Sequence, residues 1–447
     1  AATVIADQPI FVTNNVPPNM MLALSVEWPT GMVAAYKGAG PYNTTAYDTT
    51  YVAANRYVGY FDPRFCYTYY QTSGVTANNF PETPLTGART AAAAALEYFR
   101  PTAISTGAST HDCAGDTFSG NWLNWASAHA LDAFRFAMTG GDRVIDTTTT
   151  TVVEKSRHSG QGDYAQFPIK NGTAAKATAT PFGAWAGVYA RVHAGGGAEL
   201  NPFNDNNTRG RVIQISNQST FPAHNGTTNL TYTFMVRVQV CDSANANTNL
   251  RFEYNGTAAD YNSCLGYPVG SASSTVYKPV GLLQKNSDKM RFGATGYLLD
   301  SADARAGGVL RARQKSIGPN LVVANGPAIT NANAEWEAAT GTYIQNPDPT
   351  DATASSTASG TTISYSGVIN YLNKFGKLHT ASFKSKDPFA ELYYSALRSL
   401  RNMTPIPEYV SGLTAAMYEG FPVITTAVTE PAAPFTPTNL ALMPIQY

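Results

Sequence analysis

The stretch from Ser119 to Gly141 reads SGNWLNWASAHALDAFRFAMTGG and is the most informative part of the chain. Ser119 is a favoured N-cap residue, and Gly140 and Gly141 supply the positive φ at which helices commonly end. We therefore predict one helix of about twenty residues between these two signals.

The residues of this predicted helix divide into a narrow polar stripe and a wide apolar surface. The stripe recurs at helical spacing, and two of its members, Asp132 and Arg135, are close enough to pair. Within the apolar surface, His129 fits a satisfied core histidine better than a ligand or a base. The stripe consists of Asn121, Asn124, Ala128, Asp132, Arg135 and Thr139. The apolar surface predicts a structural core helix buried on at least two sides; its members are Trp122, Leu123, Trp125, Leu131, Phe134, Phe136 and Met138.

The composition of the chain bounds its partners. The 447 residues carry 30 Lys and Arg against 30 Asp and Glu, and only 13% are charged, so a basic surface for nucleic acid is not expected. Asn, Thr, Ser, Gly and 26 Tyr take the place of surface charges, which is typical of secreted or cell-surface proteins. Such residues also dominate adaptable binding surfaces, and both interpretations stay open.

Four cysteines form an even set without metal-site spacing and predict two disulfides. Pairing of neighbours along the chain would join Cys66 to Cys113 and Cys241 to Cys264, each contributing about 3 to 4 kcal/mol in the chain-entropy model. Disulfides persist only in an oxidising compartment. The opening AATVIADQP is consistent with a signal peptide already removed, and no run of 18 apolar residues predicts a membrane span.

The coarse pattern predicts four segments. In the first, residues 1–158, the run Val16 to Val26 resembles the first strand of a mostly parallel sheet. A Tyr-, Gly- and Asn-rich excursion at 34–117 contains a predicted helix at Thr90 to Phe99. Thr147 to Thr151 favours an extended segment, and Val152 to Arg157 a short helix.

The second segment, residues 159–275, has the turn signals and alternation of an inserted β-rich subdomain. Its clearest strand is Leu230 to Val240, with one predicted buried face and one wet face. In the third segment, 276–403, we predict a strand at Met290 to Leu298 and two helices, one capped by Ser366 and one by Asp387 with Pro388 following. Residues 404–447 are rich in proline and predict an extended connector.

No catalytic motif is present in the sequence. Gly195 to Gly197 and Gly376-Lys377 are too short for phosphate loops. The runs Asn204 to Asn207 and Asn245 to Asn249 offer oxygen ligands for calcium but too few carboxylates, so polar turns are the better interpretation.

Several strings resemble the type IV pilus tip-associated adhesin and assembly proteins of the PilY/PilC type. They occur in the family's order and cover nearly the whole chain. The strings are QPIFVTNNVPPNMMLAL near the start, SGNWLNW followed by the Thr run and VVEKSR, YKPVGLLQKNSDKMRFGATGYL at Tyr277 to Leu298, GGVLRAR at Gly307 to Arg313, NPDP at Asn346 to Pro349, and KSKDPFAELYYSALR at Lys384 to Arg398.

The resemblance implies an α/β fold with a von Willebrand factor A-like, mostly parallel sheet flanked by helices and a large β-rich insertion. It implies export through the periplasm to the pilus tip, contact with minor pilins and with host-cell or other surfaces, and no membrane span. Relatives usually continue into a C-terminal β-propeller with a calcium loop. That region is not in this sequence, so its functions are not implied here.

Many relatives carry D-x-S-x-S after the first strand, where oxygen ligands hold a divalent cation. The matching positions here are Ser25, Glu27 and Pro29, which lack the first carboxylate and the last hydroxyl. We therefore expect neither a cofactor nor a metal.

We predict a pilus adhesion and assembly factor without enzymatic activity. One alternative is a metal-dependent receptor module in which Glu27 and distant oxygens hold Mg²⁺ or Ca²⁺. A remote alternative is a secreted hydrolase, for which the only candidate residues are His111, Asp112, His129 and His193.

Overall fold

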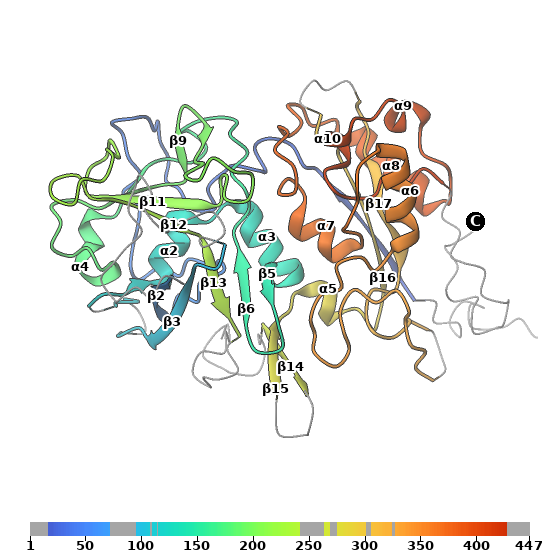
Figure 1. Ribbon diagram of the computed structural model, residues 1–447, viewed down its shortest axis with the longest axis horizontal. Helices are drawn as coiled ribbons and strands as arrows, with labels where there is room; N and C mark the ends of the chain where they lie inside the picture. Colours follow the sequence, from blue (N-terminus) through green and yellow to red (C-terminus); the bar gives the residue numbers. More distant parts are fainter. Residues whose placement is uncertain are drawn as a thin grey trace, which may run out of the picture.

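The computed structural model describes residues 17–71, 95–107, 110–113, 115–241, 263–268, 275–300, 305–323 and 327–426. Figure 1 shows two lobes side by side, with α3 (Ala130–Thr139) and α7 (Val368–Lys374) where they meet. We call residues 34–279 the first lobe, and residues 17–33 with 280–426 the second lobe. Each lobe has its own large apolar core.

The first lobe is built on two mainly antiparallel sheets. The six-stranded sheet has the order β4-β2-β3-β13-β6-β5 and the four-stranded sheet the order β12-β11-β8-β7. The six-stranded sheet comprises β4 (Phe118–Ser119), β2 (Phe65–Tyr70), β3 (Tyr98–Ile104), β13 (Arg237–Val240), β6 (Thr151–Glu154) and β5 (Asp142–Asp146). The four-stranded sheet comprises β12 (Thr231–Met235), β11 (Val212–Ser216), β8 (Tyr189–Arg191) and β7 (Lys170–Asn171). The remaining elements are α2 (Gly120–Ser127), η2 (Thr173–Ala175), α4 (Lys176–Ala179), β9 (His193–Gly195), β10 (Ala198–Glu199), β14 (Cys264–Pro268) and β15 (Thr275–Pro279).

The second lobe is built on a three-stranded sheet. In it, β1 (Asn19–Leu24) pairs in parallel with β16 (Arg291–Gly296), which pairs antiparallel with β17 (Val309–Lys315). Both α7 and α8 (Phe389–Leu400) pack against this sheet. Gly308 permits the approach of α8, because a Cβ there would lie 2.3 Å from Leu392 Cδ1. The other helices are α5 (Leu282–Lys285), α6 (Pro349–Ser359), α9 (Pro407–Val410) and α10 (Ala415–Tyr418).

The predicted von Willebrand factor A-like, mostly parallel sheet is wrong. Among the described strands, β1 and β16 form the one extended parallel pair, and β13 meets β3 in parallel at a single residue pair. The physical reason is connection length, because parallel neighbours need a crossover whereas short returns give antiparallel pairs. The Thr-rich turn between β5 and β6 is such a return.

The single long helix predicted at Ser119 is in fact two helices. Ala128 and His129 are extended, because the chain at 33–35 pairs with them: Ala35 N donates to Ala128 O and Ala130 N donates to Val33 O. These bonds use backbone groups that a continuous helix would need internally. The Asp132 carboxylate then accepts the N–H of His129 at 2.8 Å and caps α3.

The predicted polar stripe of this helix is buried and does not face solvent. Asn124 Nδ2 donates to the carbonyls of Tyr57 and Phe61, and its Oδ1 accepts the Phe61 N–H. Asn121 Oδ1 accepts the Tyr57 N–H in the same way. The two amides therefore hold the segment 55–61 against α2, while Asp132 and Arg135 bind other partners.

Several local predictions are corrected. Thr147 to Thr150 form a turn, and Val152 to Glu154 belong to a strand, β6. The strand predicted at Leu230 to Val240 is present but splits at Val236 into β12 and β13, which enter different sheets, and its polar face is buried. The predicted helix at Thr90 to Phe99 lies partly outside the described residues, and Tyr98 and Phe99 begin β3.

The four predicted segment boundaries stay predictions. Two of the segments, however, have a structure that differs from the predicted one. Strand β13, from the segment 159–275, lies between β3 and β6 of the first segment in one sheet. Residues 404–426 contain α9 and α10 and bury Tyr418, Phe421 and Val423, so this part is not an extended connector. Residues 427–447 lie outside the described part.

Trp122 provides a test of the first core. It is fully buried in α2, and we expect Trp122→Ala to lower the free energy of unfolding by about 3 to 5 kcal/mol, because it removes apolar area and leaves a cavity. Chemical denaturation measures the change, with Phe389→Ala, at a 60% exposed position, as the control. A Trp122→Ala protein of unchanged stability would show that α2 is not part of the scaffold.

Candidate functional site

The three positions of the expected degenerate cation site follow β1. Ser25 Oγ donates to Asp387 Oδ1 at 2.9 Å, and Thr30 Oγ1 donates to Glu27 Oε1 at 2.7 Å. The carbonyl of Pro29 accepts the Val33 N–H at 3.0 Å. Within the described ranges, no group of three or more His, Cys, Asp or Glu is arranged to hold a metal ion. The expectation that no metal binds here stays a prediction.

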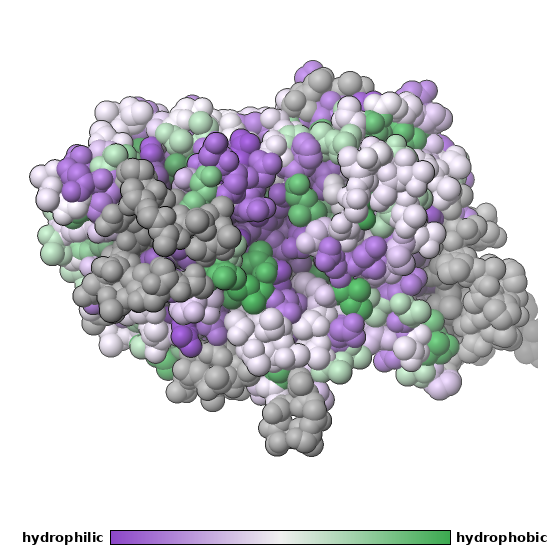
Figure 2. Space-filling model, viewed as in Figure 1, coloured by the Kyte–Doolittle hydropathy of each residue, from purple (hydrophilic) through white to green (hydrophobic). Residues whose placement is uncertain are grey.

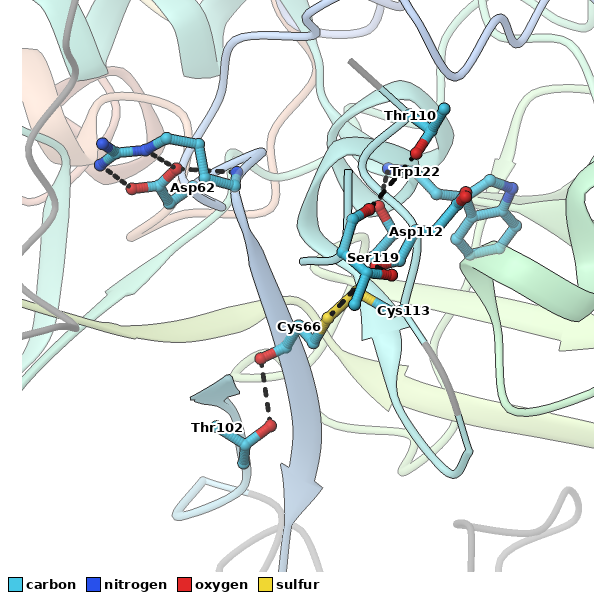
Figure 3. Close-up of a disulfide and its surroundings, with 10 residues drawn as sticks. Asp62, Cys66, Thr102, Thr110, Asp112, Cys113, Ser119 and Trp122 are labelled. Carbon is cyan, nitrogen blue, oxygen red and sulfur yellow. Dashed lines mark hydrogen bonds and ion pairs between the residues drawn. A yellow bond between two sulfur atoms is a disulfide. The ribbon is translucent and has the colours of Figure 1, made fainter. Parts of the chain in front are cut away.

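Both predicted disulfides are present. Cys66 in β2 joins Cys113, and Cys241 directly after β13 joins Cys264 at the start of β14. Figure 3 shows the first of them beside Ser119, whose Oγ accepts the Trp122 N–H at the start of α2. This disulfide therefore ties the segment before α2 to the strand with which β4 pairs.

The residues nominated for a hydrolase are not brought together as a group. His111 Nδ1 lies 2.7 Å from Ala53 O, whereas His129 and His193 lie near a third histidine, His158. His129, His158 and His193 are each fully buried. Of the two Asn runs considered for calcium, Asn204 to Asn207 forms a turn in which Asp205 accepts backbone N–H groups, and Asn245 to Asn249 lies outside the described part.

The three histidines form a buried cluster with Lys155. His129 Nε2 lies 3.1 Å from His158 Nδ1, and His129 Nδ1 lies 3.0 Å from Lys155 Nζ. The His158 ring stacks on His193 with 5.3 Å between centroids. Burial lowers the pKa of His129 to about 4 and that of Lys155 to about 7, because the charged forms lose hydration.

A second buried group crosses the boundary between the lobes. Asp142 accepts from Lys374 at 2.5 Å and from Lys377, both at or just after α7. Glu154 binds Lys377 at 2.7 Å, and also Arg211 and Arg237. The carboxylates belong to the first lobe and the lysines to the second, so this ion network joins them. The surrounding cations lower the pKa of Asp142 to about 2 against the opposing effect of burial.

Arg157 makes a third contact between the lobes. Its guanidinium donates to Glu199 in β10 and to the carbonyls of His379 at 2.7 Å and Thr380 at 3.0 Å. Gln161 adds a reciprocal pair of bonds with the backbone of Phe383. Residues 155–161 therefore form a strap on the first lobe that binds the loop after α7.

An exposed apolar surface lies on α8. Of the apolar side chains of this helix, Leu392 and Ala396 are buried. Four large side chains remain in solvent, and their exposed fractions are 60% for Phe389, 54% for Tyr393, 50% for Tyr394 and 37% for Leu397. The helix thus carries more apolar surface than the sheet beneath it covers, which is typical of an interaction surface.

Comparison with known proteins shows what this chain is similar to. The family described as "PilY1 homolog, small alpha/beta domain" matches residues 48–208. A type IV pilus biogenesis factor PilY1 homolog of Xylella fastidiosa (strain Temecula1 / ATCC 700964) is 33% identical over 445 residues. The chain is PilY1-like. The matched region is 95% of this chain and 32% of the relative, so the chain spans about a third of that protein. No solved structure matches.

Of the strings that carry the resemblance in this PilY1-like chain, one builds the boundary between the lobes and two contribute to the sheet of the second lobe. The block from SGNWLNW to VVEKSR forms α2, α3, β5 and β6, and supplies Asp142, Glu154, Lys155 and Arg157. The string at Tyr277 to Leu298 supplies β16, and GGVLRAR supplies β17. The sequence pattern identifies this block but not the role of its charges, for which the available signal is Glu154 and Lys155 at the end of a short apolar strand.

Glu154 tests the ion network. We expect Glu154→Gln to lower the free energy of unfolding by about 3 to 5 kcal/mol, because three buried cations lose their shared anion. Chemical denaturation measures the loss. Glu408→Gln, at an exposed position, is the control and should change stability by less than about 0.5 kcal/mol. Equal stabilities of the two variants would contradict the importance of the network.

Proposed function

We propose that this chain acts in type IV pilus biogenesis as a contact protein of the pilus tip. The observation that carries the proposal is its 33% identity, over 95% of its length, to a type IV pilus biogenesis factor. Because the chain covers only a third of that relative, the role proposed is that of this region. The partners we propose are pilus components, minor pilins in particular, with adhesion to cells or other surfaces as the consequence.

The disulfides support a location outside the cytoplasm. Two disulfides pair all four cysteines, and such bonds persist in the periplasm and beyond it. None of the described helices is long and apolar enough to cross a membrane. A zero formal net charge gives no support for a nucleic-acid partner. On the strength of the disulfides we propose that the protein acts at the cell surface after export.

We propose contact, not catalysis, as the mode of action. The histidines that the fold brings together are buried, so they cannot meet a substrate in this conformation. By contrast, α8 presents aromatic side chains to solvent, and aromatic side chains dominate the energetics of protein interfaces. The exposed face of α8 is the surface that we assign to a pilus component.

The test uses a strain in which the gene is deleted and then complemented. We expect deletion to reduce surface pili, and the full-length wild-type protein to restore them and to capture minor pilins in a pull-down. Unchanged piliation on deletion together with no capture would reject the pilus role itself.

The assigned surface is tested by Phe389→Ser combined with Tyr393→Ser. These side chains lie one helical turn apart, and their exposure predicts a stability change within about 1 kcal/mol. We expect pilin capture to fall at least about tenfold, which corresponds to roughly 1.4 kcal/mol of binding. Tyr70→Ser, at another exposed tyrosine, is the matched control. Wild-type capture by the double variant would reject α8 as the contact surface but would leave the proposed pilus role unaffected.

A further inference from the structure

The hydrogen bonds of the buried cluster fix where its protons lie. Lys155 Nζ has three acceptors, namely Ser156 O at 3.1 Å, Gly210 O at 3.2 Å and His129 Nδ1 at 3.0 Å, which use all three hydrogens of an ammonium group. With Lys155 charged, as it is below its pKa of about 7, His129 therefore carries its hydrogen on Nε2 and donates it to His158 Nδ1. His158 in turn carries its hydrogen on Nε2, a buried atom without a hydrogen-bond partner.

His193 is fixed as a neutral ring by its own contacts. Its Nδ1 accepts the N–H of Gly195 at 3.1 Å, so its hydrogen lies on Nε2 and is donated to Phe167 O at 2.9 Å. All three imidazoles thus have their acceptor nitrogen occupied by a buried donor. A further proton on any of these rings would create an N–H group that points at another buried N–H donor.

The charge of the cluster is balanced as it stands. Asp132 accepts the N–H groups of His129 and Ser156, and its Oδ2 lies 3.7 Å from His129 Nδ1. Its negative charge balances the single positive charge that Lys155 carries below its pKa of about 7. A second positive charge would have no anion of its own, because the nearby carboxylate Glu154 is already shared by three cations. The remaining charged groups that face the cluster are Arg157, Arg211, Lys377 and, around His193, Arg191 and Asp163.

The cluster belongs to the same strap that holds the second lobe. Lys155 and His158 flank Arg157, whose guanidinium binds the carbonyls of the loop after α7. Backbone bonds anchor the strap to the first lobe through Lys155 N to Val236 O and His158 N to Gly210 O. A strap that moves to hydrate a protonated His158 must therefore shift Arg157 as well.

We propose that residues 155–161 form an acid-sensitive latch, in which protonation of the His129–His158–His193 cluster frees the strap and loosens the contact between the lobes. Figure 2 shows hydrophilic residues gathered at the surface where the lobes meet. This inference concerns the fold and stands independently of the proposed pilus role.

The direction of the pH effect follows from the histidines. Their pKa values lie below the ordinary value of about 6.5, since burial and neighbouring cations disfavour the charged rings. The open state then binds more protons than the closed state below about pH 6.5, so the closed latch loses stability as pH falls from there toward 4, the pKa of His129.

The experiment is hydrogen–deuterium exchange at about pH 7.5 and about pH 5, corrected for intrinsic exchange rates. We expect peptides covering 153–161 and 376–384 to lose protection at the lower pH, by up to about tenfold per pH unit for each proton taken up. Peptides covering β11 and β12 are the internal control and should stay protected. Equal protection of the strap at both pH values would overturn the proposal.

His158→Asn separates protonation from packing. The Asn Oδ1 can take the place of the His158 Nδ1 acceptor but does not titrate, and the Nε2 that is lost has no partner. We expect the acid-induced loss of protection to be at least about tenfold smaller, because one proton fewer is taken up and each proton changes protection about tenfold per pH unit. His224→Asn, at a histidine outside the cluster, should leave the loss of protection unchanged. An unaltered response in a folded His158→Asn protein would refute the latch.

If His158→Asn fails to fold, NMR titration of the wild-type imidazoles decides the question. The cluster histidines should stay neutral in the closed protein at about pH 6, below their ordinary pKa of about 6.5. Ordinary titration of all three rings without loss of protection would overturn the proposal.

Discussion

The relative position of the two lobes depends on a buried set of charges. Asp142 and Glu154, at the ends of β5 and β6, are both fully buried, and a buried carboxylate is tolerable only when cations satisfy it. Lys374 and Lys377 supply them from the other lobe, and Arg211 and Arg237 complete the set from the first. Because Lys377 binds both carboxylates and Lys374 binds Asp142, the lobes cannot slide past one another without separating these charges.

The sequence predicts those parts of this arrangement that follow from local pattern. Alternation locates Leu230 to Val240 and Met290 to Leu298 as strands, and the even set of cysteines yields both disulfides. The prediction of one long helix at Ser119 is wrong because residues 33–35, nearly a hundred positions away, interrupt it by pairing with Ala128 and Ala130. The prediction of a parallel sheet is wrong because one apolar strand, at Val16 to Val26, indicates that a sheet exists but not the direction of the neighbouring strands.

The candidate sites are harder to predict, because their members meet only in the fold. Asp142 and Lys377 are separated by 235 positions, and His129 by 29 from His158. His129 alone fits a core histidine, which describes its burial correctly but omits the second histidine and the lysine beside it. In a chain with only 13% charged residues, the run from Glu154 to His158 directly after an apolar strand is the one local sign of a buried polar site.

Family likeness and contact surface therefore lie in different places. The block from Ser119 to Arg157 carries much of the resemblance, and it builds the buried boundary of the lobes, where Glu154 and Arg157 are nearly inaccessible. The likeness in this block thus lies in buried structure, and it does not show what the surface binds. The aromatic face of α8 is different. The buried residues of this helix pack against the sheet, whereas Phe389 and Tyr393 are exposed in the described structure. A partner is therefore to be sought on this exposed apolar surface, whereas the contact between the lobes is controlled by the strap at residues 155–161.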